Sequence, residues 1–594
     1  MQPRPPRPGN TRQIINTNRR LTIWYTAVLV IISVIIFRLF YLQVIRHDYY
    51  QRAALSDQLK QYTIAPERGT IEAHQSGNVV PLVLNQKLYT LYADPTLVKD
   101  PDGTAAKISA VIQGDKTAYV GAMRAKHSRY QVLAKRLTQD QYKKILALKL
   151  PGIGLQAQDY RVYPQGDLAA QVLGFVNDDG QGKYGIEQLF DGQLAGKPGL
   201  LKAITDVNGV PLAASRDNIQ INPTPGNSYV LTLDLAMQRQ AETILKQGLQ
   251  KIGSKSGSVV IIDPDDGSIK ALANYPTFDP AKFYEVKDPA AFNDSAVSAP
   301  LEVGSIMKTL TVSTGLDQGA ITPTTTYNDP GYVTIDGSTI KNVEDIPQNP
   351  VSVQEILKYS LNTGAVHIFK QLGGGDFNQK GRDILYDYFT NHFQLGKMTG
   401  IEQPNEQPGT IYGPNNGSAL NLRYANMAFG QGLTATILQM ASAVSSVLNG
   451  GTYYKPHLID SMTSGSGKVI KTQPTVIRHN VVKPAVSQEL QSLMEYVFEQ
   501  NHGVYQSDDH PGYNVGGKTG TGQIAENGGY KAGVYNGTFL GFVGGDKPQY
   551  VVAVLADSPD LPGFESAGAQ GAAPIFGKIA DMLINDFGVE PISR

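Results

Sequence analysis

Three short motifs, in one order along the chain, could together carry out acyl transfer through a serine. The tetrapeptide Ser305–Lys308 (S-I-M-K) is followed by Ser360–Asn362 (S-L-N) and then by Lys518–Thr521 (K-T-G-T). A serine hydroxyl is a weak nucleophile and needs a neighbouring base, and a residue three positions further along a helix shares its face. A lysine can be that base only when burial or nearby positive charge lowers its pKa. We therefore expect Ser305 to be the nucleophile and Lys308 its base.

The second motif follows a predicted helix start. Ser352 with Glu355 three residues later is a capping box, in which each side chain satisfies the backbone N–H group of the other residue. We expect Ser360 and Asn362 to lie at the end of this short helix. There Ser360 could transfer a proton to or from the leaving group, and the side-chain amide of Asn362 could hold a peptide backbone.

The third motif lies among glycines, which is typical of an edge strand that a ligand approaches closely. Lys518 would supply positive charge, and the hydroxyls of Thr519 and Thr521 could bind a substrate carboxylate beside Gly520. The backbone N–H groups of Ser305 and Thr521 are expected to form an oxyanion hole, in which one lost donor typically costs about 10²–10³ in rate.

A second copy of the first motif, Ser338–Lys341 (S-T-I-K), makes the choice of nucleophile an open question at the level of motifs. It lies in a Thr- and Gly-rich, turn-like region without helical apolar spacing, so we interpret it as a chance match. Ser76–Asn78 likewise matches the second motif by chance. The sequence contains neither H-E-x-x-H nor G-x-S-x-G, which disfavours a zinc protease and a Ser-His-Asp enzyme.

Composition sets broad limits on the protein. With 594 residues, two or three domains are expected. Lys plus Arg equals Asp plus Glu at 52 each, so no overall charge indicates a nucleic-acid partner. The absence of cysteine excludes disulfides and thiolate metal sites. No metal or cofactor is expected.

The N-terminal region predicts a membrane anchor. Five arginines and no acidic residue precede an apolar stretch over residues 21–45, which Arg38 interrupts, and the first acidic residue is Asp48. About 20 apolar residues span a bilayer, and basic residues before a first span favour a cytoplasmic N-terminus. We expect residues 1–20 in the cytoplasm and the catalytic part outside the cytoplasmic membrane. The alternative, a cleaved signal peptide, is disfavoured because the stretch is long and no small-residue cleavage site follows.

The rest of the chain predicts two domains of an α+β protein. The breaker cluster at residues 222–226 suggests a boundary between a first domain, 46–225, and a second, 226–594. The second domain shows a helix that begins after Asp234 and stops at Gly253, a hairpin, a long helical middle, a second hairpin and a final helix. An antiparallel sheet with helices on its faces and an all-helical subdomain is the natural packing of this pattern.

The motifs and their surroundings resemble the class B penicillin-binding proteins, which are monofunctional D,D-transpeptidases of peptidoglycan synthesis. The tracts that carry the resemblance are Glu302–Ser305 (similar to E-P-G-S), Asn362–Ala365 (N-x-G-A), residues 430–451, Arg68–Ile71 (R-G-x-I) and Gly182–Glu187 (G-x-x-G-x-E). Two departures are visible. Val303 replaces the usual proline, and His74–Gly77 stands where D-R-N-G is common. The tracts before residue 190 resemble a non-catalytic pedestal of dimerisation type, and we interpret their Arg and Glu residues as structural ion pairs.

The resemblance implies a mechanism and partners. The D-Ala-D-Ala end of a donor stem peptide would acylate Ser305 and release D-Ala, and an amine of a neighbouring stem peptide would then form the cross-link. β-Lactams would mimic the donor. Such proteins work with a SEDS-family glycosyltransferase and with other division or elongation proteins, and the division-type member is the more similar. No transglycosylase module is recognisable before residue 225.

Two other functional classes remain as alternatives. A β-lactamase or D,D-carboxypeptidase would resolve the acyl-enzyme with water, but Glu402–Asn405 lacks the spacing of the class A E-x-x-x-N loop. A β-lactam sensor or a non-catalytic scaffold would keep the fold without turnover. A sensor needs further signalling segments, and a scaffold should have lost a motif residue, whereas all are present.

Overall fold

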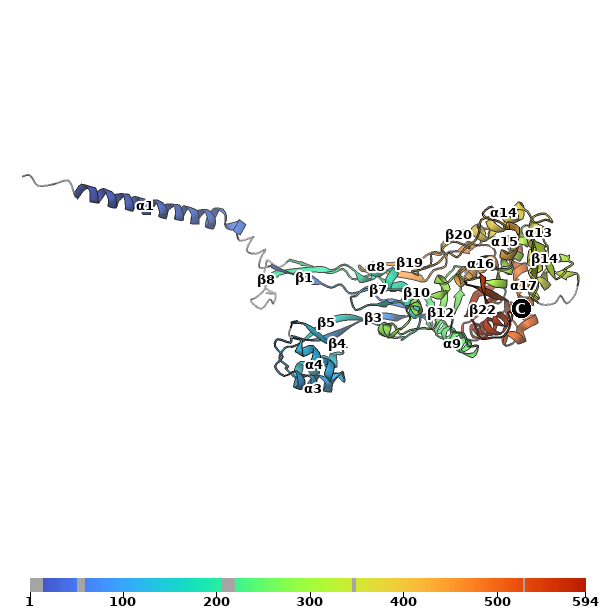
Figure 1. The fold of residues 1–594 in the computed structure, drawn as a ribbon, viewed down its shortest axis with the longest axis horizontal. Coiled ribbons are helices and arrows are strands. Elements are labelled where there is room, and N and C mark those ends of the chain that lie inside the picture. Colours follow the sequence, from blue (N-terminus) through green and yellow to red (C-terminus); the bar gives the residue numbers. More distant parts are fainter. Residues whose placement is uncertain are drawn as a thin grey trace, which may run out of the picture. The chain divides into compact units, whose positions relative to one another are not determined.

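The computed structural model describes residues 14–50, 59–125, 127–204, 219–343, 349–526 and 529–593 (Figure 1). The chain forms two compact units. One comprises Met1–Pro66 and Lys197–Thr224, and the other comprises Glu67–Gly196 and Pro225–Arg594. The predicted boundaries of the tail, anchor, pedestal and catalytic domain stay predictions.

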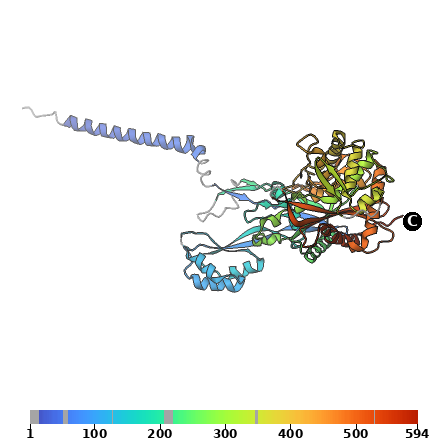
Figure 2. The ribbon, with the colours of Figure 1, turned by 45° about the vertical axis from the view of Figure 1, so that its right-hand side comes forward.

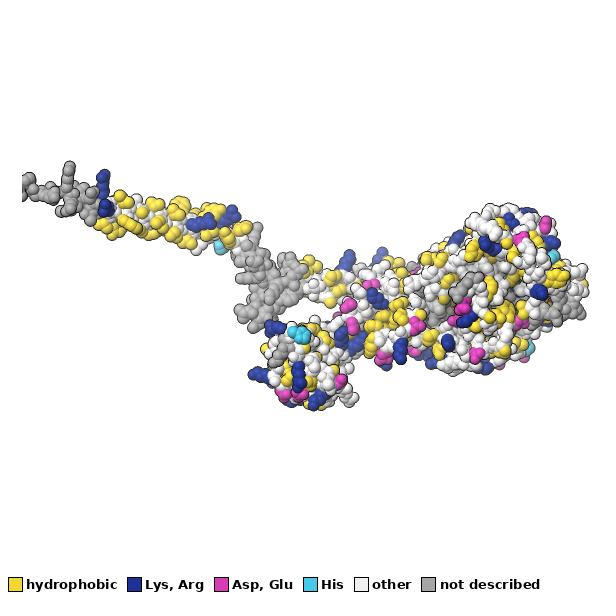
Figure 3. All heavy atoms as spheres, in the orientation of Figure 1, with side chains coloured by type: hydrophobic (Ala, Val, Ile, Leu, Met, Phe, Trp, Pro, Cys, Tyr) yellow, Lys and Arg dark blue, Asp and Glu magenta, His cyan; other side chains and the backbone are white. Residues whose placement is uncertain are grey.

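The first unit contains the predicted anchor. Helix α1 (Ile14–Phe40) continues into the π-helical turn η1 (Tyr41–Ile45), and residues 19–45 are long and apolar enough to cross a membrane. Hydrophobic side chains cover the helix, and none of the span is buried (Figure 3). The Arg38 guanidinium lies 5.7 Å from the ring centroid of Tyr41 near the end of this helix. A three-stranded antiparallel sheet of β1 (Leu59–Ile64), β8 (Gly199–Ile204) and β9 (Ile219–Ile221) completes the unit.

The second unit begins with the region that resembles a pedestal. Its long strand β3 pairs antiparallel with β2, β4 and β5, and three helices pack beside them around buried residues that include Leu91 and Ile108. The elements are β2 (Ile71–Gln75), β3 (Asn78–Ala93), α3 (Pro101–Ile112), α4 (Lys116–Arg124), β4 (Gln131–Leu137), α5 (Gln139–Ala147) and β5 (Ile153–Val162).

The motif residues of this region form a buried ion-pair cluster. The carboxylate of Glu187 is fully buried, and its two oxygens lie 2.5 Å from Arg68 Nη2 and 2.7 Å from Arg161 Nη2. Two guanidinium groups thus compensate one carboxylate whose burial alone would be costly. The ion pairs expected from the sequence are present here.

The sheet of the second unit that carries the third motif is antiparallel and has five strands in the order β12-β11-β23-β22-β21. The strands are β11 (Ser256–Ile262), β12 (Ile269–Tyr275), β21 (Asn514–Glu526), β22 (Gly529–Gly544) and β23 (Pro548–Asp557). β11 with β12, and β22 with β23, are the two predicted hairpins. β21 forms one edge of this sheet, as its glycine-rich sequence predicts.

Helices cover both faces of this sheet because its side chains alternate between two hydrophobic clusters. On one face α9 (Leu235–Lys251) and α18 (Ala573–Asp586) pack against residues such as Val259 and Phe539. On the other face α11 (Met307–Asp317) and α16 (Ile437–Leu448) pack against residues such as Val260 and Leu540. The side chain of Asp234 caps α9, as predicted.

The middle of the second unit is helical. It contains α12 (Val353–Lys358), α13 (Asn362–Leu372), α14 (Gln379–Asp387) and α15 (Leu420–Met427), and α17 (Pro484–Tyr505) leads back to the sheet. Figure 2 shows these yellow and green helices gathered together beside the red strands. The predicted α+β class, with an antiparallel sheet and a helical subdomain, is confirmed.

Candidate active site

Ser305 lies at the start of a helix that packs directly on the edge strand of the sheet. The turn η4 (Gly304–Ile306) leads into α11, and Gly304 has a φ of +64°. A Cβ atom at Gly304 would lie 2.3 Å from the carbonyl oxygen of Thr521, so only glycine permits this approach. Val303 has a φ of −73°, which is also the φ of proline, so the departure at this position leaves the helix entry intact.

The lysine of the first motif is fully buried beside the serine. Lys308 Nζ lies 2.9 Å from Ser305 Oγ, 2.5 Å from the carbonyl oxygen of Ser360 and 2.8 Å from Asn362 Oδ1. Burial lowers the pKa of Lys308 well below its usual value, and the charge of Lys518 lowers it further. The structure therefore brings together the base and nucleophile that the sequence predicted, with the base displaced toward its neutral form.

The oxygens around Lys308 Nζ determine where a neutral amine would direct its two hydrogens and its lone pair. The carbonyl oxygen of Ser360 and Oδ1 of Asn362 can only accept hydrogen bonds. A neutral amine has two hydrogens, and both would be taken by these two oxygens. The lone pair is then left for a hydroxyl that can donate, and the nearer of the two hydroxyls is that of Ser305, at 2.9 Å against 3.2 Å for Ser360. This is the arrangement that a general base requires.

The second motif does not lie at the end of one helix, and that prediction was wrong. The capping box of Ser352 and Glu355 is present, but α12 ends at Lys358. Ser360 has a φ of +53° in the turn that follows, and Asn362 is the first residue of α13. The left-handed conformation of Ser360 reverses the chain, and this reversal lets its carbonyl and hydroxyl groups both face Lys308.

The third motif lies along β21 at the sheet edge. Lys518 is buried with 2% exposure, and its Nζ lies 3.1 Å from the carbonyl oxygen and 3.2 Å from Oγ1 of Thr519. A Cβ atom at Gly520 would lie 2.4 Å from Thr538 Oγ1, so this position also requires glycine. The strand presents Thr519, Gly520 and Thr521 to the same cavity as Ser305.

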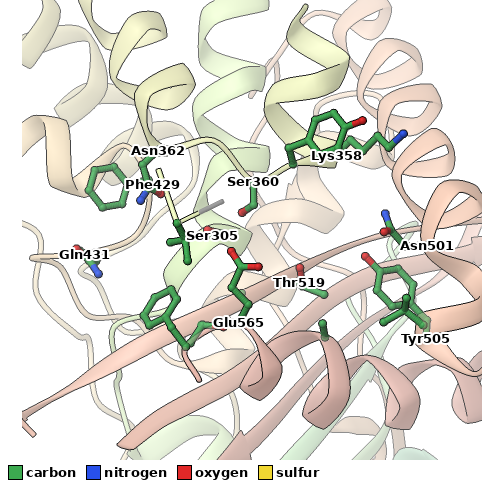
Figure 4. A pocket seen from close by; sticks show the side chains of 17 residues that line it. Ser305, Lys358, Ser360, Asn362, Phe429, Gln431, Asn501, Tyr505, Thr519 and Glu565 are labelled. Atoms are coloured by element: carbon green, nitrogen blue, oxygen red, sulfur yellow. The ribbon is translucent and has the colours of Figure 1, made fainter. Parts of the chain in front are cut away.

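This cavity has a volume of about 220 Å³ (Figure 4). Predicted site residues that line it are Ser305, Ser360, Asn362, Thr519, Gly520 and Thr521, while Lys308 and Lys518 are buried beneath its surface. Lining residues that the motifs did not reveal include Phe429, Gln431, Asn501, Tyr505 and Glu565. Gln431 belongs to the tract of residues 430–451, which carries the family resemblance, so the sequence did contain a signal for this residue. Glu565 lies in a loop without a recognised motif.

The second S-x-x-K sequence does not contribute to this cavity. Ser338–Lys341 forms strand β15, which pairs antiparallel with β14 (Tyr332–Ile335) in a short hairpin. The side chains of Ser338 and Lys341 are exposed, and neither is among the described residues that line the cavity. The interpretation of this copy as a chance match is consistent with its place in the structure.

Comparison with known proteins places the chain in a family. Residues 257–581 match the model of the penicillin-binding protein transpeptidase domain, and residues 63–231 match that of the penicillin-binding protein dimerisation domain. The chain is 28% identical over 590 residues to stage V sporulation protein D of Bacillus subtilis, and this alignment covers 97% of this chain and 87% of that protein. It is 30% identical over 453 residues to penicillin-binding protein PbpB of Mycolicibacterium smegmatis, and this alignment covers 75% of this chain and 67% of that protein.

Solved structures agree with this placement. A crystal structure of a peptidoglycan synthetase from Bifidobacterium adolescentis is similar, with a TM-score of 0.68, 25% identity, and coverage of 90% of this chain and 98% of that one. The matched transpeptidase model spans more than half of the 594 residues and contains all three motifs. The chain therefore belongs to the penicillin-binding protein transpeptidase family.

Proposed function

We propose that the protein is a serine-type peptidoglycan D,D-transpeptidase in which Ser305 forms the acyl-enzyme. The observation that carries the proposal is the position of Lys308 Nζ, 2.9 Å from Ser305 Oγ and held by two oxygens that only accept hydrogen bonds. Relatives from Pseudomonas aeruginosa and Neisseria meningitidis carry the name probable peptidoglycan D,D-transpeptidase, at 26% and 25% identity.

The donor would bind along β21. The carboxylate of its terminal D-Ala would lie on the hydroxyls of Thr519 and Thr521, with the positive charge of Lys518 close by. Ser305 Oγ would attack the penultimate carbonyl while its proton moves to Lys308. The backbone N–H groups of Ser305 and Thr521 would stabilise the oxyanion.

Breakdown of the tetrahedral intermediate releases D-Ala. Ser360, whose Oγ lies 3.2 Å from Lys308 Nζ, could pass the proton to the departing amine. An amine of a second stem peptide would then displace Ser305 and complete the cross-link. Asn362 would hold the donor backbone through its side-chain amide. β-Lactams would acylate Ser305 in the same way.

The cellular setting follows from the anchor and the relatives. Residues 19–45 would form a single-pass anchor in the cytoplasmic membrane, with the N-terminus inside and the transpeptidase outside. Stage V sporulation protein D and an FtsI homologue of Mesostigma viride are among the relatives, which supports a role at the division septum. A SEDS-family glycosyltransferase is the expected membrane partner.

The proposal is tested by labelling the detergent-solubilised full-length protein with a fluorescent penicillin, alongside Ser305→Ala and Ser338→Ala variants. Intact mass and peptide mapping locate the adduct. We expect a long-lived adduct on Ser305 that Ser305→Ala abolishes and Ser338→Ala retains. An adduct on Ser338, or none in any variant, would overturn the assignment. Rapid release of hydrolysed drug would instead support the β-lactamase alternative.

A further inference from the structure

A carboxylate shares the active-site cavity with the proposed nucleophile. Among the described residues that line the cavity, Glu565 is the one acidic side chain, and Figure 4 shows its carboxylate pointing into the pocket. The charge of Glu565 raises the pKa of Lys308, which burial and Lys518 lower more strongly. Glu565 is therefore electrostatically part of the site, although none of the three motifs includes it.

The loop that carries Glu565 is held against the strand that forms the cavity floor. A Cβ atom at Gly568 would lie 2.5 Å from the carbonyl oxygen of Gly520, so the backbones of the two segments are in direct contact. On the other side of Glu565, the ring of Phe564 packs edge-on against Tyr535 at a centroid distance of 5.0 Å. The hydroxyl of the buried Ser566 closes a local turn through the carbonyl oxygens of residues 562 and 563. These contacts fix the Glu565 side chain on the cavity side.

The charges of the reactants show which of them a carboxylate would serve. The donor enters with a carboxylate, which Lys518 attracts and Glu565 repels. That carboxylate leaves with D-Ala once the acyl-enzyme has formed. The second reactant is an amine, which is a cation in neutral solution before it loses its proton.

We propose that Glu565 is a specificity-determining residue that binds the ammonium group of the acceptor stem peptide. This inference rests on the proposed function and deepens it. The preferred acceptor would carry its reacting amine without a free carboxylate on the adjacent carbon, because a second anion next to Glu565 is repelled. Primary amines of side chains, of interpeptide bridges or beside an amidated carboxyl group belong to this class.

The chemical step after binding balances without another reagent. The bound ammonium loses one proton to solvent, and the neutral amine attacks the carbonyl carbon of the acyl-enzyme. The new C–N bond forms, the bond from that carbon to Ser305 Oγ breaks, and the second amine proton passes through Lys308 to Ser305 Oγ. Glu565 takes no proton in this scheme, and it acts by concentrating and orienting the cationic acceptor.

The test separates acylation from acyl transfer. The full-length protein is acylated by a peptidyl thioester donor, and the acyl-enzyme is divided between water and one of two acceptors, glycinamide or glycine, which differ by one carboxylate. Products are counted by mass spectrometry. Each rate is divided by the concentration of the acceptor's free amine, because the carboxylate of glycine also raises the pKa of its ammonium, and for the native protein we then expect glycinamide to react at least about tenfold faster than glycine. Glu565→Gln should reduce this ratio to below about threefold, and Glu565→Lys should invert it.

Asp560→Asn is the matched control because Asp560 is an exposed acid of the same loop that is not among the described lining residues. It removes the same charge and should leave the ratio as in the native protein. If Glu565→Gln is acylated normally but keeps the native ratio, the inference is overturned while the proposed function stands. Failure of the native protein to acylate would overturn the proposed function first.

A measurement on the native protein covers the case in which Glu565→Gln does not fold. In 1 M salt the Debye length falls to about 3 Å, so an ionic preference should weaken several-fold while acylation by a neutral thioester changes little. A glycinamide preference that is unaffected by salt would exclude an ion pair with Glu565.

Discussion

Replacing the amide of Asn362 by a carboxylate should disable the proposed base without changing the shape of the site. Asn362 Oδ1 lies 2.8 Å from Lys308 Nζ, so Asn362→Asp places a full negative charge at that distance from the amine. At an effective dielectric constant of 20, the attraction between the ammonium and the carboxylate is about 6 kcal/mol. Repulsion from the Lys341 carbonyl oxygen, which now accepts from Asn362 Nδ2 at 3.0 Å, reduces this value. Even about 1.5 kcal/mol would raise the pKa of Lys308 by about one unit.

The assay is the pH dependence of the second-order rate constant for acylation by a penicillin. Because the neutral amine of Lys308 is the proposed base, acylation should rise as the pH passes upward through the pKa of Lys308, which burial holds below its usual value. In Asn362→Asp this rise should move at least about one pH unit higher, and the rate at neutral pH should fall at least about tenfold.

Asn362→Leu is the control, since it removes the same hydrogen-bond acceptor without adding charge. It should slow acylation but should not move the rise to higher pH. The reasoning fails if Asn362→Asp leaves the midpoint unchanged or moves it to lower pH. Either result would mean that Lys308 is not the group whose titration limits acylation.

Three further variants test other parts of the argument. Gly304→Ala forces a Cβ to within 2.3 Å of Thr521 at a positive φ, so acylation should fall at least about tenfold and the melting temperature should drop. Glu187→Gln leaves the buried Arg161 without its carboxylate, while Arg68 keeps Asp191 at 2.8 Å, and chemical denaturation should show a loss of about 3–5 kcal/mol, with acylation of the folded fraction unchanged. Burial by itself would raise the pKa of Asp581. The hydrogen bond from His510 opposes this effect and helps lower the pKa to about 2. Asp581→Asn should therefore lose about 1–2 kcal/mol of stability above pH 4, and this difference should vanish as the pH falls below 2. A stability difference that persists at low pH would contradict the assignment.

Local patterns were sufficient for the elements of the fold. The capping box at Ser352, the cap at Asp234 and the alternation of the two hairpins each depend on neighbours within a few residues, and each is present. The end of α12 was predicted less well. A serine at a φ of +53° has no distinctive sequence signal, and the contacts that stabilise Ser360 there come from Lys308, which is distant in the chain.

The sequence by itself determined the chemistry, because residue type and the order of three motifs already specify a nucleophile, a base and an anion-binding strand. Tertiary structure favours Ser305 over Ser338 as the proposed nucleophile, since both begin the same motif and, of the two, Ser305 lies beside the buried Lys308 while Ser338 lies in an exposed hairpin. It also placed Glu565 in the cavity through backbone contact between Gly568 and Gly520. The physical reason is that burial and charge proximity, which set the pKa of Lys308, arise only when distant segments pack together.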